Sequence, residues 1–225
     1  MLPEPIAEGL WSVNGHFQTP LFRGSVRMTV LAGDEGLVLY SPVALAPEAI
    51  ARIAELGPVR AILAPNLYHY RFLRQAAEAF PQARVFVPAA LEARSGPIPR
   101  AETMTRDRPP ALPGGIDHLI VERHAIRETV LFHRPSRSLV TADLLYNYQS
   151  EHGAGEKAFF RLLGCYGAPG VVFYHRFAIR DKAAVRELVE QVRTWNPQRI
   201  VIGHGRIIED STAAELFAAA WRRFG

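Results

Sequence analysis

Asp143 is the residue of this sequence whose chemistry most needs a partner, because it lies inside a mostly apolar stretch, residues 138–147. A carboxylate is costly to bury unless a hydrogen bond, an opposite charge or a metal ion compensates for the lost water. Two histidines are candidate partners. His124 precedes the strand-like run 128–133, and His204 follows the apolar run 199–203. Histidine and aspartate that converge from strand ends are a common ligand set for a metal ion.

The composition is that of an ordinary soluble domain, and it excludes several classes of partner. The chain has 225 residues, enough for one sizeable core, with 48% apolar and 21% charged residues. Its net charge of +4 comes from scattered rather than clustered arginines, which argues against nucleic-acid binding. No run approaches the roughly 20 apolar residues that span a bilayer, so no membrane partner is expected.

The cysteine content and the N-terminus both predict a cytoplasmic protein. Cys165 is the single cysteine, which fits a reducing compartment because no intramolecular disulfide can form. The first residues carry neither a basic segment nor a long apolar run, so no signal peptide is recognised. The oligomeric state is not fixed by the sequence, and a homodimer stays open.

Strand-like and helical patterns alternate along the chain and predict two sheets packed face to face, with helices outside. Expected strands are residues 9–13, 26–31, 36–43, 59–64, 84–87, 116–122, 128–133, 137–142 and 199–203. Expected helices are residues 47–56, 70–80 and 157–163, one that begins after Asp181 and one that begins at Thr212 with a capping-box pattern. Residues 95–115 are rich in proline and glycine and read as a surface connection.

Residues 148–178 interrupt this rhythm and read as an aromatic-rich insertion with a helical part. We expect this segment to form a cap beside the site of Asp143 and to supply its apolar wall, because ligand pockets are mostly apolar with few polar groups.

The order of three motifs resembles the second half of the metallo-β-lactamase superfamily. They are the stretch from His124 to Glu128, the Thr-Ala-Asp that ends at Asp143, and the Gly-His-Gly around His204. A closer resemblance is to the DUF4336 branch of that superfamily, carried by residues 41–43, 64–69 and 132–136. The resemblance implies an αββα four-layer sandwich and one metallo-β-lactamase-like domain over residues 1–225.

The chain departs from the superfamily at its main signature, His-x-His-x-Asp-His. The equivalent stretch begins at Asn66 and contains one histidine, His69. A complete two-metal site is therefore not expected. The resemblance instead implies one divalent ion (zinc, iron or manganese) on His69, Asp143 and His204, with His124 as a further ligand at its edge. A site with three protein ligands and open positions activates water.

These residues imply catalysis by Asp143 and His69, and substrate contacts from Asn66 and Tyr68. The expected function is hydrolysis of a small-molecule substrate of unknown identity by metal-activated water. The alternative is a metal-free, non-catalytic binding or scaffold protein, which the altered signature favours. RNA processing is a third hypothesis, and the absence of a basic stripe argues against it.

Each candidate also has a structural explanation. Asp143 can accept backbone hydrogen bonds at a strand end, and His204 can be fixed in a tight glycine-flanked turn. His69 can pack beneath a turn, and Asn66 can cap a helix. His124 stands among charged residues that suggest a solvated strand end.

Overall fold

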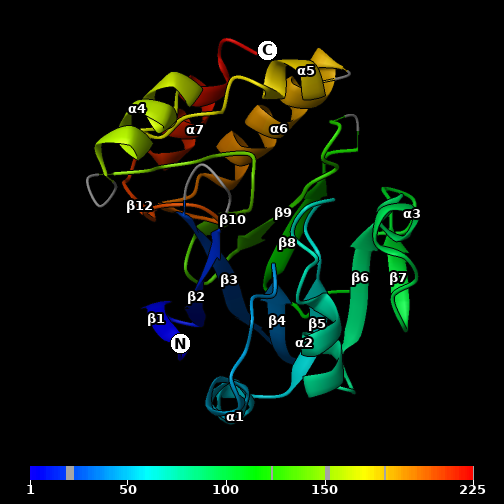
Figure 1. The fold of residues 1–225 in the computed structure, drawn as a ribbon. Coiled ribbons are helices and arrows are strands. Elements are labelled where there is room, and N and C mark those ends of the chain that lie inside the picture. Colours follow the sequence, from blue (N-terminus) through cyan, green and yellow to red (C-terminus); the bar gives the residue numbers. More distant parts are fainter. Residues whose placement is uncertain (19–22, 123, 150–152, 180, 225) are drawn as a thin grey trace.

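The computed structural model describes residues 1–18, 23–122, 124–149, 153–179 and 181–224. Within these residues, two β-sheets face each other and helices cover their outer sides (Figure 1). One sheet has seven strands in the order β1-β2-β3-β4-β5-β6-β7, and the other has five in the order β12-β11-β10-β9-β8. The predicted αββα sandwich is confirmed.

The seven-stranded sheet changes from antiparallel to parallel pairing at β4. Its strands are β1 (Glu4–Ala7), β2 (Leu10–Gln18), β3 (Arg23–Gly33), β4 (Gly36–Tyr40), β5 (Val59–Leu63), β6 (Arg84–Pro88) and β7 (Ala101–Met104). Strands β1 to β4 pair antiparallel, and β4 to β7 pair parallel. The parallel half follows from crossover helices α1 (Pro47–Leu56), α2 (Leu73–Ala79) and α3 (Leu91–Ser95).

The five-stranded sheet has β10 at its centre. Its strands are β8 (Ile116–Ile120), β9 (Thr129–His133), β10 (Ser138–Thr141), β11 (Arg199–Ile202) and β12 (Ile208–Glu209). β9 and β10 form the expected antiparallel hairpin, whereas β10 and β11 run parallel, with Thr141 opposite Ile202. The carboxyl ends of β10 and β11 therefore lie at the same edge of this sheet.

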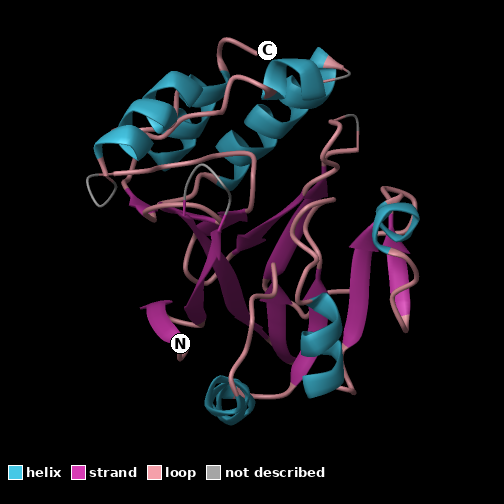
Figure 2. Cartoon of the chain, in the orientation of Figure 1, coloured by secondary structure: helices cyan, strands magenta, loops and turns pink. Residues whose placement is uncertain are grey.

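Helices flank the magenta strands on both sides in Figure 2. The later helices are α4 (Ala154–Leu163), α5 (His175–Ala178), α6 (Lys182–Trp195) and α7 (Ala213–Trp221). The Asp181 side chain caps α6 by accepting a hydrogen bond from the Ala183 amide at 2.8 Å, as predicted. Thr212 makes no such cap at α7, because its hydroxyl donates to Asp210 instead.

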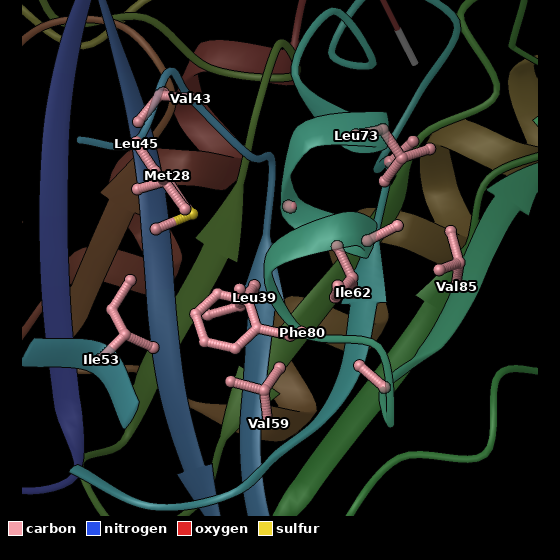
Figure 3. Close-up of a cluster of buried hydrophobic side chains, with 14 of the residues drawn as sticks. Met28, Leu39, Val43, Leu45, Ile53, Val59, Ile62, Leu73, Phe80 and Val85 are labelled. Carbon is pink, nitrogen blue, oxygen red and sulfur yellow. The ribbon is translucent and has the colours of Figure 1, made fainter. Parts of the chain in front are cut away.

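Three apolar layers hold the sandwich together. The middle layer lies between the sheets and includes Leu31, Leu63 and Val140. The layer under α1 and α2 contains Met28, Leu39 and Ile53 with seven other labelled side chains (Figure 3). The third layer joins the five-stranded sheet to α6 and α7. Burial of apolar surface on this scale is the main stabilising contribution to a fold.

The boundaries differ from the sequence prediction where a single residue interrupts a pattern. The strand expected over residues 36–43 ends at Tyr40, because Ser41 adopts a positive φ of 61°. The helix expected over residues 70–80 begins only at Leu73. The short elements β1, β7, β12 and α3 escaped prediction because two to five residues carry little periodicity. The insertion assigned to residues 148–178 contains α4 and α5, and its status as an insertion remains a prediction.

Candidate metal site

His69, Asp143 and His204 converge on one point, and we refer to these three residues as the His-Asp cluster. Their ligand atoms all lie within 4.8 Å of one another. The Nε2 atoms of His69 and His204 are 3.1 Å apart. The Asp143 carboxylate lies 3.3 Å from Nε2 of His69 and 3.1 Å from Nε2 of His204. All three side chains are nearly buried.

The cluster forms at the edge where three strands end. Asp143 follows β10, and His204 follows β11, which is parallel to β10. His69 lies in the turn after β5 of the other sheet. The ends of β5, β10 and β11 therefore lie near one another, as expected.

Two glycines allow His204 to reach this point. A Cβ on Gly203 would lie 2.8 Å from the Ala142 carbonyl oxygen, so only glycine permits β11 to pass so close to the end of β10. Gly205 has a φ of +95°, and a Cβ there would lie 2.2 Å from the Asn147 carbonyl oxygen. The Gly-His-Gly motif is thus a steric requirement of the His204 position.

We expect Gly205→Ala to lower the free energy of unfolding by about 1–3 kcal/mol, because strained backbone of this kind costs that much per residue. Urea unfolding followed by circular dichroism measures the change. Gly155→Ala is the matched control, because Gly155 is helical and nothing lies within 4 Å of its added Cβ. The control should leave stability unchanged or raise it by up to about 1 kcal/mol. Equal effects of both variants would contradict the steric role of Gly205.

The outer nitrogen of each histidine is fixed by a second hydrogen bond. Nδ1 of His204 donates to the Ser25 carbonyl oxygen at 2.6 Å, so a neutral His204 ring carries its lone pair on Nε2, inside the cluster. Nδ1 of His69 lies 2.7 Å from the Ser41 hydroxyl, which can donate or accept. Such outer hydrogen bonds orient the rings of metal-ligating histidines in proteins.

The Asp143 carboxylate is held on both of its oxygens. Oδ1 accepts a hydrogen bond from the Tyr146 hydroxyl at 2.8 Å, and Oδ2 accepts one from the Asn66 side-chain amide at 2.8 Å. The Tyr146 hydroxyl also lies 3.0 Å from the Tyr174 hydroxyl. These contacts fix the plane of the carboxylate before any ligand arrives.

Glu128 lies behind the cluster and is completely buried. Its carboxylate accepts hydrogen bonds from the amides of Ala142 and Asp143 at 2.7 and 2.8 Å and contacts the Thr141 hydroxyl. The Asn66 amide donates to it at 2.9 Å. Burial and the charge of Asp143 raise the pKa of Glu128, and these donors oppose the rise. Glu128 therefore ties the Asp143 loop to the turn that carries His69.

The charges within the cluster depend on one another. Burial alone would raise the pKa of Asp143, but the charge of His69 and the close contact of both imidazole rings hold it well below its ordinary value. Burial lowers the pKa of His69, but the charge and hydrogen bond of Asp143, with the charge of Glu128, together raise it. The carboxylate of Asp143 thus stays ionised and attracts a positive charge to its neighbours.

The geometry of the cluster fits a cation at its centre. Two imidazole nitrogens only 3.1 Å apart, beside a carboxylate, cannot all present lone pairs to one another, so either a proton or a metal ion lies between them. A proton on Nε2 of His69 meets this need whether the His69 ring is neutral or charged. Zinc bonds of about 2.0–2.1 Å in a tetrahedron separate the ligand atoms by about 3.3–3.4 Å, close to the distances of the cluster.

Comparison with solved structures identifies the fold. This chain superposes on the metallo-β-lactamase DIM-1 exposed to ceftazidime with a TM-score of 0.69 and 10% sequence identity. The superposition covers 99% of this chain and 97% of the DIM-1 chain. The chain has a metallo-β-lactamase fold. A metallo-β-lactamase from Pontibacter korlensis gives a TM-score of 0.65 at 14% identity, covering 98% of each chain. The mono-zinc form of the metallo-β-lactamase FIM-1 from Pseudomonas aeruginosa gives a TM-score of 0.62 at 13% identity. This superposition covers 98% of this chain and 94% of the FIM-1 chain.

The family model for the domain of unknown function DUF4336 matches residues 8–101. This match bears out the predicted resemblance to DUF4336 over these residues, and the solved structures confirm the predicted fold. No protein of curated function matches the sequence. None of the helices that the structure describes is both long and apolar enough to span a bilayer.

His124 lies outside the His-Asp cluster of this metallo-β-lactamase fold, in contrast to the expected ligand role. Its Nδ1 accepts a hydrogen bond from the Ile126 amide at 3.3 Å, and its Nε2 lies 3.0 Å from Nδ1 of His175. Burial lowers the pKa of His124 to about 3 and that of His175 to about 4, so both rings are neutral. His124 is 2% exposed, so the expectation of a solvated strand end was also wrong.

Asn66 and Tyr68, the expected substrate contacts, differ in accessibility. Asn66 is completely buried, and its oxygen accepts hydrogen bonds from the amides of Tyr68 and His69. A side chain that is buried and bonded in this way does not reach a substrate, so the expectation for Asn66 is corrected. Tyr68 is 54% exposed and lines the cavity beside the cluster, and its contact with substrate stays a prediction.

Sequence reasoning missed Glu128, Tyr146 and Tyr174 as parts of the site. Glu128 stands next to Arg127 in the sequence, which suggested solvent rather than burial. Tyr146 comes three residues after Asp143, and this spacing is the only signal in the sequence for its hydrogen bond to the carboxylate. Tyr174 lies far from the motifs in sequence and no pattern marked it.

A cavity of about 460 Å³ opens beside the cluster, and Asp143, His69 and His204 line it. Of residues 148–178, only Tyr174 is among the described lining residues. Most of the apolar wall instead comes from the seven-stranded sheet, the loop after β4, the turn that carries His69 and the segment before β9. The side chains are Phe17, Val26, Val43, Phe72 and Ile126. The expectation that the segment 148–178 supplies the wall therefore holds for one tyrosine only.

Proposed function

We propose that this protein is a metal-dependent hydrolase that holds one divalent ion on His69, Asp143 and His204. The convergence of their three ligand atoms within 4.8 Å, at the mouth of a cavity, carries the proposal. The substrate is a small molecule of unknown identity. Zinc, iron and manganese are the candidate ions, because imidazole and carboxylate donors suit all three.

A divalent ion with three protein ligands and an open position supplies a Lewis acid that makes water nucleophilic near neutral pH. The residues of the chain prepare this site in advance. Tyr146 and Asn66 fix the two oxygens of Asp143, and Ser25 sets the tautomer of His204. His69 loses the proton that it otherwise shares with Asp143 when a cation takes that place.

The cluster should bind one metal ion per chain and no more. Among the described residues, His69, Asp143 and His204 form the only group of three histidine, cysteine or acidic side chains with this spacing. His124 is engaged with His175, and Asn66 is engaged with two carboxylates. Among the described residues, no second group of three such side chains is therefore present to hold another ion.

Elemental analysis of protein purified without chelator, and again after incubation with excess zinc, manganese or iron(II), tests this stoichiometry. We expect about one equivalent per chain. Two equivalents would contradict a single site. If no metal binds after reconstitution, the hydrolase proposal falls.

The alternative is a non-catalytic binding protein in which a proton replaces the metal ion. The raised pKa of His69 favours it, because a protonated His69 satisfies Asp143 without any metal. Metal analysis and ligand binding with a chelator distinguish the two proposals. The alternative predicts that the purified protein contains no metal and that a chelator does not change ligand binding.

A further inference from the structure

Among the described residues that line the cavity beside the His-Asp cluster, Arg71 is the one arginine or lysine. We propose that this cavity binds an amphipathic small molecule with a single anionic group, a carboxylate or a comparable oxyanion, and that Arg71 pairs with that group. Binding of this molecule does not depend on the proposed function. Only the statement that the molecule is the substrate of the metal site rests on it.

The cavity wall is suited to an apolar body. Side chains of Phe17, Val26, Val43, Phe72 and Ile126 line it. A volume of about 460 Å³ lies within the range of small-molecule pockets, which are mostly apolar with a few polar groups that fix orientation. The apolar part of a ligand gains from leaving water in such a place.

The charges around the cavity leave Arg71 uncompensated. Asp143 is the only carboxylate among the described lining residues, and its oxygens are already bonded to Tyr146 and Asn66. The remaining polar lining consists of the phenols of two tyrosines and the imidazoles of three histidines, Tyr68, Tyr174, His16, His69 and His204. None of these groups offers Arg71 a negative charge at neutral pH.

Arg71 has no carboxylate partner among the described residues. Its side chain is exposed, and its guanidinium carbon lies 5.6 Å from the centre of the Phe72 ring. Arg84 and Arg106, by contrast, each pair with a glutamate. A guanidinium that lines a cavity without a counterion matches the planar, bidentate geometry of a carboxylate or phosphate group.

The position of Arg71 ties this group to the metal site. Arg71 follows His69 by two residues in the turn that leads into α2, and both line the same cavity. A ligand anchored at Arg71 with its apolar part along Phe72 therefore lies beside the His-Asp cluster. Arg71 is in this proposal a specificity-determining residue.

The test compares two ketones that cannot be hydrolysed, 5-oxo-5-phenylpentanoate and valerophenone. They differ only in the terminal group, which is a carboxylate in the first and a neutral methyl group in the second. Isothermal titration calorimetry measures both affinities on the wild-type protein as purified and on Arg71→Gln, Arg71→Lys and Arg52→Gln. Arg52 is exposed on α1 and does not line the cavity, so it is the control for a general loss of positive charge. Because binding is measured without turnover, an inactive enzyme does not obscure the result.

We expect the wild type to bind the anionic ketone about tenfold more tightly than the neutral one, as one charge-assisted hydrogen-bonded pair provides. Arg71→Gln should lose this preference while binding valerophenone within about twofold of the wild type. Arg71→Lys should retain part of the preference for the anionic ketone, and Arg52→Gln should retain all of it.

Three results would overturn the proposal. One is equal affinity of the wild type for the two ketones, and another is the absence of binding of either. The third is a preference for the anion that persists in Arg71→Gln, because the carboxylate would then bind the metal site or another cation. If the expected preference appears but the wild type holds no metal, the substrate class stands as a ligand class and only the proposed hydrolase function fails.

Discussion

His204→Ala should abolish metal binding and hydrolysis together. The substitution removes one of three donors and leaves only His69 and Asp143, which cannot complete a three-ligand site. We expect metal content to fall from about one equivalent to near zero, and hydrolysis to fall at least about 100-fold, since even outer-shell partners of metal ligands contribute 10–100-fold. Elemental analysis and an ester-hydrolysis assay on the same preparation measure both changes.

His16→Ala is the matched control for this loss. His16 lines the same cavity but is not one of the three converging donors, so the variant should keep its full metal content. Circular dichroism shows that both variants are folded before they are compared. Full metal content in His204→Ala would show that the ion binds elsewhere in the chain.

Glu128→Ala should destabilise the whole fold more than any other single change discussed here. The substitution leaves the amides of Ala142 and Asp143 and the side chain of Asn66 without their acceptor in the protein interior. Breaking a buried network of this kind costs about 3–5 kcal/mol, because buried donors lose both water and their partner. The midpoint and slope of urea unfolding measure this free energy.

Glu187→Ala provides the comparison for Glu128→Ala. Glu187 pairs with Arg106 at the surface, where both side chains are nearly half exposed, so its removal should cost at most about 1 kcal/mol. Glu128→Gln keeps one acceptor oxygen and should lie between the two. A cost near 1 kcal/mol for Glu128→Ala would mean that water enters and satisfies the abandoned donors.

The sequence predicts which residues form the His-Asp cluster better than it predicts the residues that surround the cluster. Asp143 and His204 stand at the ends of apolar runs, so strand pairing alone brings them to one edge of a sheet. Glu128 could not be predicted as buried, because a glutamate next to an arginine at the start of a strand has the same pattern when the strand end is solvated. Its burial follows from the packing of the His69 turn against the Asp143 loop, which joins residues far apart in the sequence.

His124 illustrates a different limit of sequence reasoning. Its order relative to Asp143 and His204 fits the superfamily motif, but motif order does not reveal which way a ring turns. The partner that engages its Nε2, His175, lies in the segment that interrupts the pattern of the fold. A spacing argument can identify a candidate ligand, but a neighbouring side chain decides whether its lone pair is free.

The Asn66 side chain both donates and accepts hydrogen bonds, which limits how the site can be re-engineered. One amide donates to both Glu128 and Asp143, while its oxygen accepts from the amides of Tyr68 and His69. A histidine at this position has two ring nitrogens and cannot reproduce four hydrogen bonds. Restoring the first histidine of the superfamily signature would thus break the support of Asp143 before a second ion could bind.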